Sequence, residues 1–289
     1  MIYDLQFIIY YSLFTMGFGA DSHTLTGDIR FHKNFHSRFV SRDRDVIVYL
    51  PPGYRRSRVK RYPVLYMHDG QNLMDGATSF VPGKEWRVDE TAQRLIKSKV
   101  IEPLIIVGIY NTGVDRIDEY TPTRDEGRQM GGSADDYGHM LVLELKPFID
   151  SSYRTLTGAQ HTAMAGSSLG GLVTMYLGLK YSHVFGKLAV LSPSAWWDNR
   201  VITRRVKELA SKPNVKIWLD TGTAEGKDGD ALREAALLRD ALLQKGWKLN
   251  EDLKYFEAQG GIHDEAAWAE RVEPVLRFLF PRGKGKGRF

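Results

Sequence analysis

The sequence predicts an α/β fold, in which a mostly parallel β-sheet carries helices on both faces. Three observations lead to this prediction: short apolar runs recur along the chain, amphipathic stretches of helical length separate them, and one run leads into a glycine-rich turn. Continuous apolar strands that alternate with helices are typical of parallel sheets buried on both sides. The runs lie at 63–68, 104–110, 161–166, 187–192, 215–221 and 253–258.

Two further stretches complete the predicted fold. Residues 35–50 alternate in polarity and are rich in β-branched and aromatic side chains, which predicts antiparallel N-terminal strands joined at Arg42-Asp43. The longer polar segment 111–133 is expected to form a surface excursion that borders a functional site. The helix-like stretches lie near 87–98, 134–152, 169–181, 230–246 and 264–280.

The length of 289 residues and the regular alternation of elements predict a single domain over 26–281. Residues 1–25 form an N-terminal segment of unknown role, and 282–289 are expected to be a basic flexible tail. Hydrophobic residues make up 43% and charged residues 26%, which is ordinary for a soluble globular protein. The chain has no cysteine, which excludes thiol catalysis, thiolate metal sites and disulfides. The sequence implies neither a metal nor an organic cofactor.

The distribution of charge bears on possible partners. The net charge is +5, but the basic residues are dispersed and no reading motif accompanies them, so no nucleic-acid partner is expected. The apolar run from Phe7 to Phe14 is too short to span a bilayer, so no membrane association is expected. No lysine or arginine precedes Arg30, which argues against a secretory signal peptide and favours the cytoplasm over secretion. The oligomeric state is not indicated.

The strongest local signal is Gly166-Ser167-Ser168-Leu169-Gly170-Gly171, which fits the pattern Gly-x-Ser-x-Gly. The motif directly follows a predicted strand and precedes a predicted helix, and a serine on such a turn presents its hydroxyl over the sheet edge. An ordinary glycine-rich turn is the alternative, but the context on both sides favours a nucleophile. The spacing selects Ser168 over Ser167, and the motif indicates the α/β-hydrolase fold.

A serine hydroxyl needs a base, which is normally histidine, and in this fold the chain order is serine, acid, histidine. Two histidines follow Ser168. His183 lies in a helix-to-strand connection, at the wrong end of the sheet. His263 follows a predicted strand through Gln259-Gly260-Gly261, at the edge where the nucleophile is expected, and is therefore the predicted base.

The acid is expected in the loop after the run 215–221. Asp220 is predicted to remain within the strand, and Asp230 to cap or begin the next helix. Glu225 and Asp228 are the loop candidates. The residues alone leave these two candidates nearly even.

At this point the sequence resembles an esterase family of α/β-hydrolases that includes feruloyl esterases, acetyl xylan esterases, enterochelin-type siderophore esterases and mycolyltransferases. The resemblance extends from about residue 45 to 280, and its segments appear in the family's order. They are YLPPGY (49–54), YPVLYMHDGQNLMD (62–75), GSSLGG (166–171), LSPSAWW (191–197), DTGTAEG (220–226) and QGGIHDEAAW (259–268).

The resemblance implies roles for further residues. Feruloyl-type members place the acid after Gly-Thr-x, which favours Glu225 here, although some siderophore esterases of the family work with a serine–histidine dyad. The backbone N–H groups of Gln71 and Leu169 would form the oxyanion hole, whereas His68-Asp69 would fix the loop by hydrogen bonds. Trp196 and Trp197 would line the substrate pocket or merely pack its rim.

The predicted function is hydrolysis of carboxylic esters by a Ser-His-Glu triad, on short or aromatic acyl esters. The substrate is expected to be a small-molecule or polysaccharide-linked ester. An acyltransferase that uses the same acyl-enzyme is one alternative, and a siderophore lactone esterase is another. A non-catalytic binding protein on the same scaffold is a third, weaker one, because nucleophile, base and acid are all present.

Overall fold

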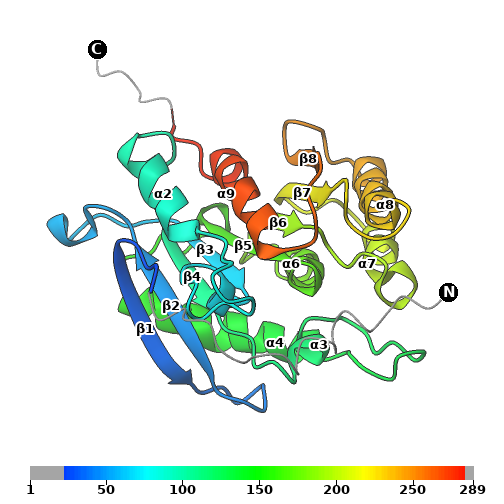
Figure 1. Cartoon of the computed structure of the whole chain (residues 1–289), viewed down its shortest axis with the longest axis horizontal. Coiled ribbons are helices and arrows are strands. Elements are labelled where there is room, and N and C mark those ends of the chain that lie inside the picture. The colour runs from blue at the N-terminus through cyan, green and yellow to red at the C-terminus, as the bar shows by residue number, and fades with distance from the viewer. Residues whose placement is uncertain (1–22, 284–289) are drawn as a thin grey trace.

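A single eight-stranded sheet forms the centre of the computed structural model, which describes residues 23–283 (Figure 1). Its strand order is β1-β2-β4-β3-β5-β6-β7-β8. Strand β2 is antiparallel to both of its neighbours, and every other pairing is parallel. The strands are β1 (Asp28–Phe35), β2 (Arg44–Leu50), β3 (Val64–His68), β4 (Ile105–Ile109), β5 (Thr162–Ser167), β6 (Lys187–Leu191), β7 (Lys216–Gly222) and β8 (Leu253–Ala258).

The predicted α/β arrangement is confirmed, and each of the six apolar runs forms a strand, β3 to β8. The prediction for residues 35–50 was wrong in one respect. The first strand lies earlier, at Asp28–Phe35, and residues 36–43 form a loop. The reason is that β1 is an edge strand, so it needs no continuous apolar run, while His36 and Asp43 pair across the loop at 2.8 Å.

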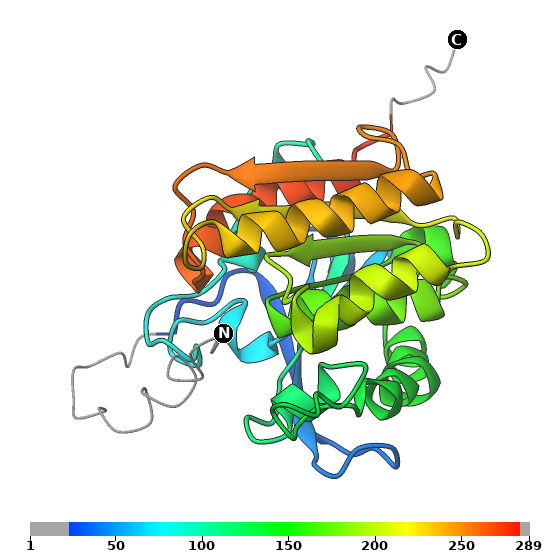
Figure 2. The ribbon, with the colours of Figure 1, turned by 90° about the vertical axis from the view of Figure 1, so that its right-hand side faces the viewer.

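The sheet separates two hydrophobic cores, because successive side chains of a strand point to opposite faces. Tyr66 and Met164 belong to one core, whereas their neighbours Leu65 and Ala163 belong to the other. The first core also receives residues of α4 to α8, and the second receives residues of α2 and α9. Figure 2 shows α7 and α8, which contact each other, on the outside of the C-terminal strands.

The predicted helices are present, but two helices were not foreseen. One is the short α3, within the predicted excursion 111–133. The other is α7, which begins at Trp197, and three of its early residues, Asp198 to Arg200, have left-handed backbone angles. The apolar spacing that marks a helix starts only after this irregular turn, at Val201. The helices are α2 (Val88–Lys97), α3 (Arg116–Glu119), α4 (Ala134–His139), α5 (Lys146–Ser152), α6 (Leu169–Lys180), α7 (Trp197–Glu208), α8 (Asp230–Lys245) and α9 (Glu265–Leu279).

A π-helical segment, Met140–Leu145, joins α4 and α5, so the predicted helix 134–152 is continuous but not regular. Within residues 23–283, no helix is both long enough and apolar enough to cross a bilayer. Residues 1–22 and 284–289, which hold most of the predicted N-terminal segment and tail, lie outside the described residues. Residues 23 to 26 are described, and Thr24 and Thr26 hydrogen-bond to carboxylates of the segment 75–89.

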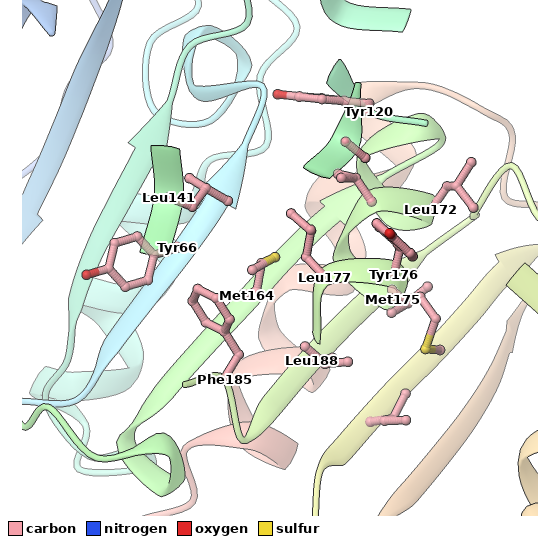
Figure 3. Close-up of a cluster of buried hydrophobic side chains, with 14 of the residues drawn as sticks. Tyr66, Tyr120, Leu141, Met164, Leu172, Met175, Tyr176, Leu177, Phe185 and Leu188 are labelled. Atoms are coloured by element: carbon pink, nitrogen blue, oxygen red, sulfur yellow. The ribbon is translucent and has the colours of Figure 1, made fainter. Parts of the chain in front are cut away.

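The core beneath α6 fixes the position of the strand-to-helix turn at residue 168. Leu177 and Leu188 lie in this core beside Met164 and Phe185 (Figure 3). A Cβ atom built on Gly178 would lie 2.3 Å from the Leu188 side chain, so α6 approaches β6 as closely as a glycine allows. Because β3 to β8 are all parallel, their carboxyl ends meet at one sheet edge, and the loops that leave them form the site.

Candidate active site

Ser168 lies between β5 and α6, as the motif predicts. Its backbone angles are φ 56° and ψ −123°, a conformation that costs a residue other than glycine on the order of 1–3 kcal/mol. Its side chain is half-buried, whereas Ser167 is 4% exposed. Of the two adjacent serines, Ser168 is thus the one that a substrate can reach.

The glycines around Ser168 allow three pieces of backbone to meet. A Cβ atom on Gly166 would lie 2.7 Å from the backbone of Gly170, and one on Gly171 would lie 2.9 Å from the Leu191 carbonyl oxygen. Gly170 itself has ordinary space, with its nearest neighbour at 3.4 Å. The requirement for glycine therefore holds at 166 and 171, and is weak at the last glycine of the Gly-x-Ser-x-Gly pattern.

The structure brings Glu225 and His263 together. His263 Nδ1 lies 2.9 Å from Glu225 Oε2, and the ring packs edge-on against Trp268 with centroids 5.0 Å apart. Glu225 is buried in the loop after β7, while the His263 side chain is 42% exposed in the loop between β8 and α9. The imidazole is therefore held from one side and open on the other.

The other candidates lie away from this pair. Asp228 is exposed, and Asp230 is the first residue of α8. Asp220 lies within β7, as predicted, and is fully buried. His183 lies in the connection between α6 and β6, at the opposite end of the strands from Ser168.

Three buried residues beside Glu225 were not singled out from the sequence. Arg271 of α9 donates from Nη1 to Asp220 Oδ1 at 2.8 Å and from Nη2 to Glu225 Oε1 at 3.3 Å. Ser192 donates to the same Glu225 oxygen at 2.6 Å and accepts from the Trp268 indole at 3.0 Å. The acid thus lies in a hydrogen-bonded network that reaches from β6 to α9.

The two buried carboxyls of this network differ in acidity. Burial opposes ionisation of Glu225, but hydrogen bonds from His263 and Ser192 and the charge of Arg271 prevail, so its pKa is lowered. Burial raises the pKa of Asp220 to about 6 in spite of the opposing charge of Arg271. Glu225 is therefore the stronger acid, and it is the one that contacts the imidazole.

Gln71 lies in a short 3₁₀ turn after β3, η2 (Gly70–Asn72). A Cβ atom on Gly70 would lie 2.6 Å from the backbone of Gly108, so the turn passes directly over β4. The Gln71 side chain accepts a hydrogen bond from the Asn111 backbone at 3.2 Å. On the other side of the strand end, Leu169 is the first residue of α6, so its N–H group has no partner within the helix.

His68 and Asp69 fix this turn. Arg116 donates to both Asp69 oxygens, at 2.8 and 2.7 Å, and Asn111 donates to Oδ1 at 2.6 Å. His68 Nδ1 lies 2.8 Å from the Tyr137 hydroxyl, and burial lowers the pKa of His68 to about 4, so the ring is neutral at pH 7. These contacts give the pair a structural task. The excursion 111–133 supplies the partners of Asp69, and α4 supplies the partner of His68.

One expected contact is not formed. Among residues 23–283, the hydrogen bond of the Ser168 hydroxyl is with Ser194 Oγ at 3.4 Å, and none joins Ser168 to His263. The main chain holds Ser194 there, because its N–H group donates to the Ser168 carbonyl at 3.0 Å. Hydrogen bonds between catalytic groups are often loose without substrate, so this geometry does not exclude the pair.

The chain matches the family described as "Putative esterase" over residues 37–279. It belongs to this esterase family. The endo-1,4-beta-xylanase/feruloyl esterase of Xylanibacter ruminicola is 26% identical over 260 residues, which cover 85% of this chain and 30% of that protein. A solved ferulic acid esterase has a TM-score of 0.69 at 20% identity, with 88% of this chain and 98% of that one covered. The enterobactin esterase of Shigella flexneri, solved with enterobactin, has a TM-score of 0.69 at 20% identity, with coverages of 89% and 60%.

Membership confirms the predicted resemblance, and the structural neighbours confirm the predicted α/β-hydrolase fold. The esterase is thus a carboxylic ester hydrolase by family. The family match spans the strand-to-helix turn and both loops that carry Glu225 and His263.

The two tryptophans of the esterase differ in position. Trp197 is 2% exposed, donates its indole N–H to the Thr123 carbonyl at 3.0 Å, and packs in the core. Trp196 is half-buried, and the Arg128 guanidinium lies 4.9 Å from its ring centre. Of the pair, Trp196 is the one with surface left for a substrate, and Trp197 has the packing role.

Proposed function

We propose that this esterase cleaves carboxylic esters through an acyl-enzyme on Ser168, with His263 as base and Glu225 as its acid partner. The observation that carries the proposal is the 2.9 Å hydrogen bond between His263 Nδ1 and buried Glu225. This bond fixes the ring and leaves Nε2 as the nitrogen for Ser168. The half-buried hydroxyl on its strained turn, at the same sheet edge, supports the assignment.

In the first half of the reaction, Ser168 Oγ attacks the ester carbonyl as His263 Nε2 removes its proton. The tetrahedral intermediate collapses when the imidazolium returns that proton to the alcohol oxygen, which leaves as the free alcohol. Water then attacks the acyl-enzyme with His263 again as base, and the carboxylic acid is released. Glu225 keeps the imidazole in the required tautomer and stabilises its positive charge.

The negative charge of the tetrahedral intermediate needs donors that are already in place. The N–H group of Leu169 at the start of α6 and that of Gln71 in η2 are the proposed donors. The turn that carries Gln71 is held by Asp69 and Arg116, which supports this role because it requires no movement during the reaction.

We propose esters of short or aromatic acids as substrates. The partly exposed Trp196, two residues after Ser194, offers an aromatic surface near the site. Proteins similar to this one are named as a feruloyl esterase and an enterobactin esterase, and feruloyl is an aromatic acyl group. Small-molecule and polysaccharide-linked esters both fit this class.

The nucleophile is tested by covalent labelling with an organophosphonate. Ser168→Ala is expected to lose labelling and essentially all esterase activity, because no other group can form the acyl-enzyme. Ser167→Ala is the matched control, one residue away, and should keep both when its circular dichroism is native. Labelling of Ser168→Ala, or its loss in a folded Ser167→Ala protein, would count against the assignment.

The acyl preference is tested with a panel of p-nitrophenyl esters together with methyl ferulate. The butyryl ester and methyl ferulate are expected to have higher kcat/KM values than the dodecanoyl ester. Faster turnover of the dodecanoyl ester would contradict the proposed substrate class.

A further inference from the structure

We propose that Arg271, together with Asp220, is a positioning residue that keeps Glu225 ionised and turned towards His263. The inference rests on the proposed triad and goes beyond it, because neither Arg271 nor Asp220 reaches the substrate. Both residues are buried below the site, at 2% and 0% exposure. They would act on the reaction through the acid alone.

Each nitrogen of the Arg271 guanidinium donates a hydrogen bond to a neighbouring group. Nε donates to the Ala267 carbonyl at 3.1 Å, one turn earlier in α9. Nη1 donates to Asp220 at 2.8 Å and to the Ser192 hydroxyl at 3.1 Å, and Nη2 donates to Glu225 at 3.3 Å. A planar guanidinium that is hydrogen-bonded at every nitrogen cannot rotate, so it fixes the positions of the groups that it contacts.

The contacts divide the two oxygens of Glu225 between two tasks. Oε1 accepts from the Ser192 hydroxyl at 2.6 Å, from the Gly222 backbone at 2.8 Å and from Arg271. Oε2 is left for His263. Rotation of the carboxylate would break the bonds to Oε1, so the network fixes the direction of the oxygen that faces the imidazole.

The charges explain why Asp220 acts together with Arg271 on Glu225. Two buried carboxylates within reach of one another cannot both stay ionised without a cation, because like charges in a buried site favour protonation. Arg271 supplies that cation. With Asp220 and Glu225 ionised, the three groups carry a single net negative charge, and it is available to the imidazolium that forms during the reaction.

Other charged groups also face His263. Asp264 and buried Glu265 follow it at the start of α9, and Lys84 binds Asp264 at 3.2 Å. Asp69 with its partner Arg116 lies on the oxyanion side, and Glu265 feels the charges of both Asp69 and His263. None of these groups contacts Glu225 in the described network, so a change at Arg271 leaves them in place.

The test is the pH dependence of kcat/KM for p-nitrophenyl butyrate in Arg271→Met. Without the cation, one of the two carboxylates takes up a proton near neutral pH, so Glu225 is no longer reliably ionised. We expect kcat/KM at pH 7 to fall about tenfold or more. We also expect the acidic limb of the profile to move up by about one pH unit.

The double variant Asp220→Asn/Arg271→Met separates positioning from structural support. Removing the second carboxylate restores a single negative charge, so we expect the acidic limb to return to the wild-type position and kcat/KM to recover about tenfold over Arg271→Met. A residue that served the fold alone would behave in the opposite way, because the double variant loses more hydrogen bonds than the single one.

A matched control exists outside the site. Arg44 is buried as Arg271 is, and donates to both oxygens of Glu119 at 2.9 and 2.7 Å. Arg44→Met should lower the melting temperature without moving the acidic limb. This control shows how much of the Arg271→Met effect comes from lost stability.

The outcomes distinguish the two proposals. A wild-type pH profile in folded Arg271→Met, or a double variant no better than the single one, would overturn the positioning role. Phosphonate labelling of the wild type and of Ser168→Ala is run in parallel. Equal labelling of these two would instead overturn the triad on which the inference rests.

Discussion

Two arginine–aspartate pairs hold the loops on either side of Ser168, and they are built differently. On the side of the proposed oxyanion hole, Arg116 donates from Nε and Nη2 to the two Asp69 oxygens, at 2.8 and 2.7 Å. On the histidine side, Arg271 gives one nitrogen to Asp220 and another to Glu225. One cation therefore serves one carboxylate in the first pair and two in the second.

The acidities follow from this difference. Burial opposes ionisation of Asp69, but Arg116 and Asn111 outweigh it and lower its pKa. The pKa of Asp220 is raised to about 6, because burial prevails over the shared Arg271. The ionised Asp69–Arg116 pair has no net charge, whereas Asp220, Glu225 and Arg271 together carry one net negative charge when both carboxylates are ionised. Only the second arrangement suits a neighbour that becomes positively charged during the reaction.

The largest expected effect is at the histidine itself. His263→Ala should lower kcat by about 10⁵–10⁶-fold, because the base and the later proton donor are both lost. His183→Ala is the control at the opposite end of the sheet and should change kcat little. Equal losses of kcat in these two folded variants would show that His263 has been wrongly assigned as the base.

A smaller loss is expected when the acid is made neutral. Glu225→Gln keeps the shape of the side chain but removes the charge next to the imidazole, and should lower kcat by roughly 10²–10⁴-fold. Asp228→Asn, in the same loop but exposed, should be close to wild type. Wild-type kcat in Glu225→Gln would mean that the esterase works with a serine–histidine dyad. The two arginine–aspartate pairs would then differ in acidity but not in their effect on catalysis.

The smallest effects concern stability, and they test the comparison directly. The raised pKa of Asp220 means that the folded state holds its proton more tightly than the unfolded state does. The stability of the wild type relative to Asp220→Asn should therefore fall as pH rises from about 4 to about 6. Asp69 has a lowered pKa, so its contribution is present above pH 3.8 and is lost as pH falls below it.

Urea unfolding of the wild type, Asp220→Asn and Asp69→Asn, both below pH 3.8 and between about pH 4 and about pH 6, measures both slopes. The two variants should differ from the wild type with pH slopes of opposite sign. Slopes of the same sign would mean that the two pairs are electrostatically alike.

The sequence was a good guide to those parts of the fold that depend on continuous apolar runs. Strands β3 to β7 lie inside the sheet and are largely buried, so most of their side chains are apolar, and each was predicted within one or two residues. Strand β1 lies at the edge, where its residues could be polar, and was displaced in the prediction. Helix α7 was missed because its first turn is irregular and its apolar spacing begins only at Val201.

The candidate site divides in the same way. Ser168 and His263 lie in local motifs with strict chain order, so they could be selected from spacing. Glu225 and Asp228 differ in burial, which depends on how the loop after β7 packs and is invisible in composition. Arg271 belongs to none of the motifs, yet it lies three residues after Trp268, on the face that α9 buries. That spacing was the available signal for the network.

The order of the site residues along the chain has a consequence for synthesis. Ser168, Asp220 and Glu225 are all translated before His263 and Arg271, so the ribosome-bound chain lacks both the proposed base and the cation until α9 emerges. Domains generally fold as units during synthesis. We therefore expect the nascent esterase to remain inert towards esters until α9 has been made and has packed on the sheet.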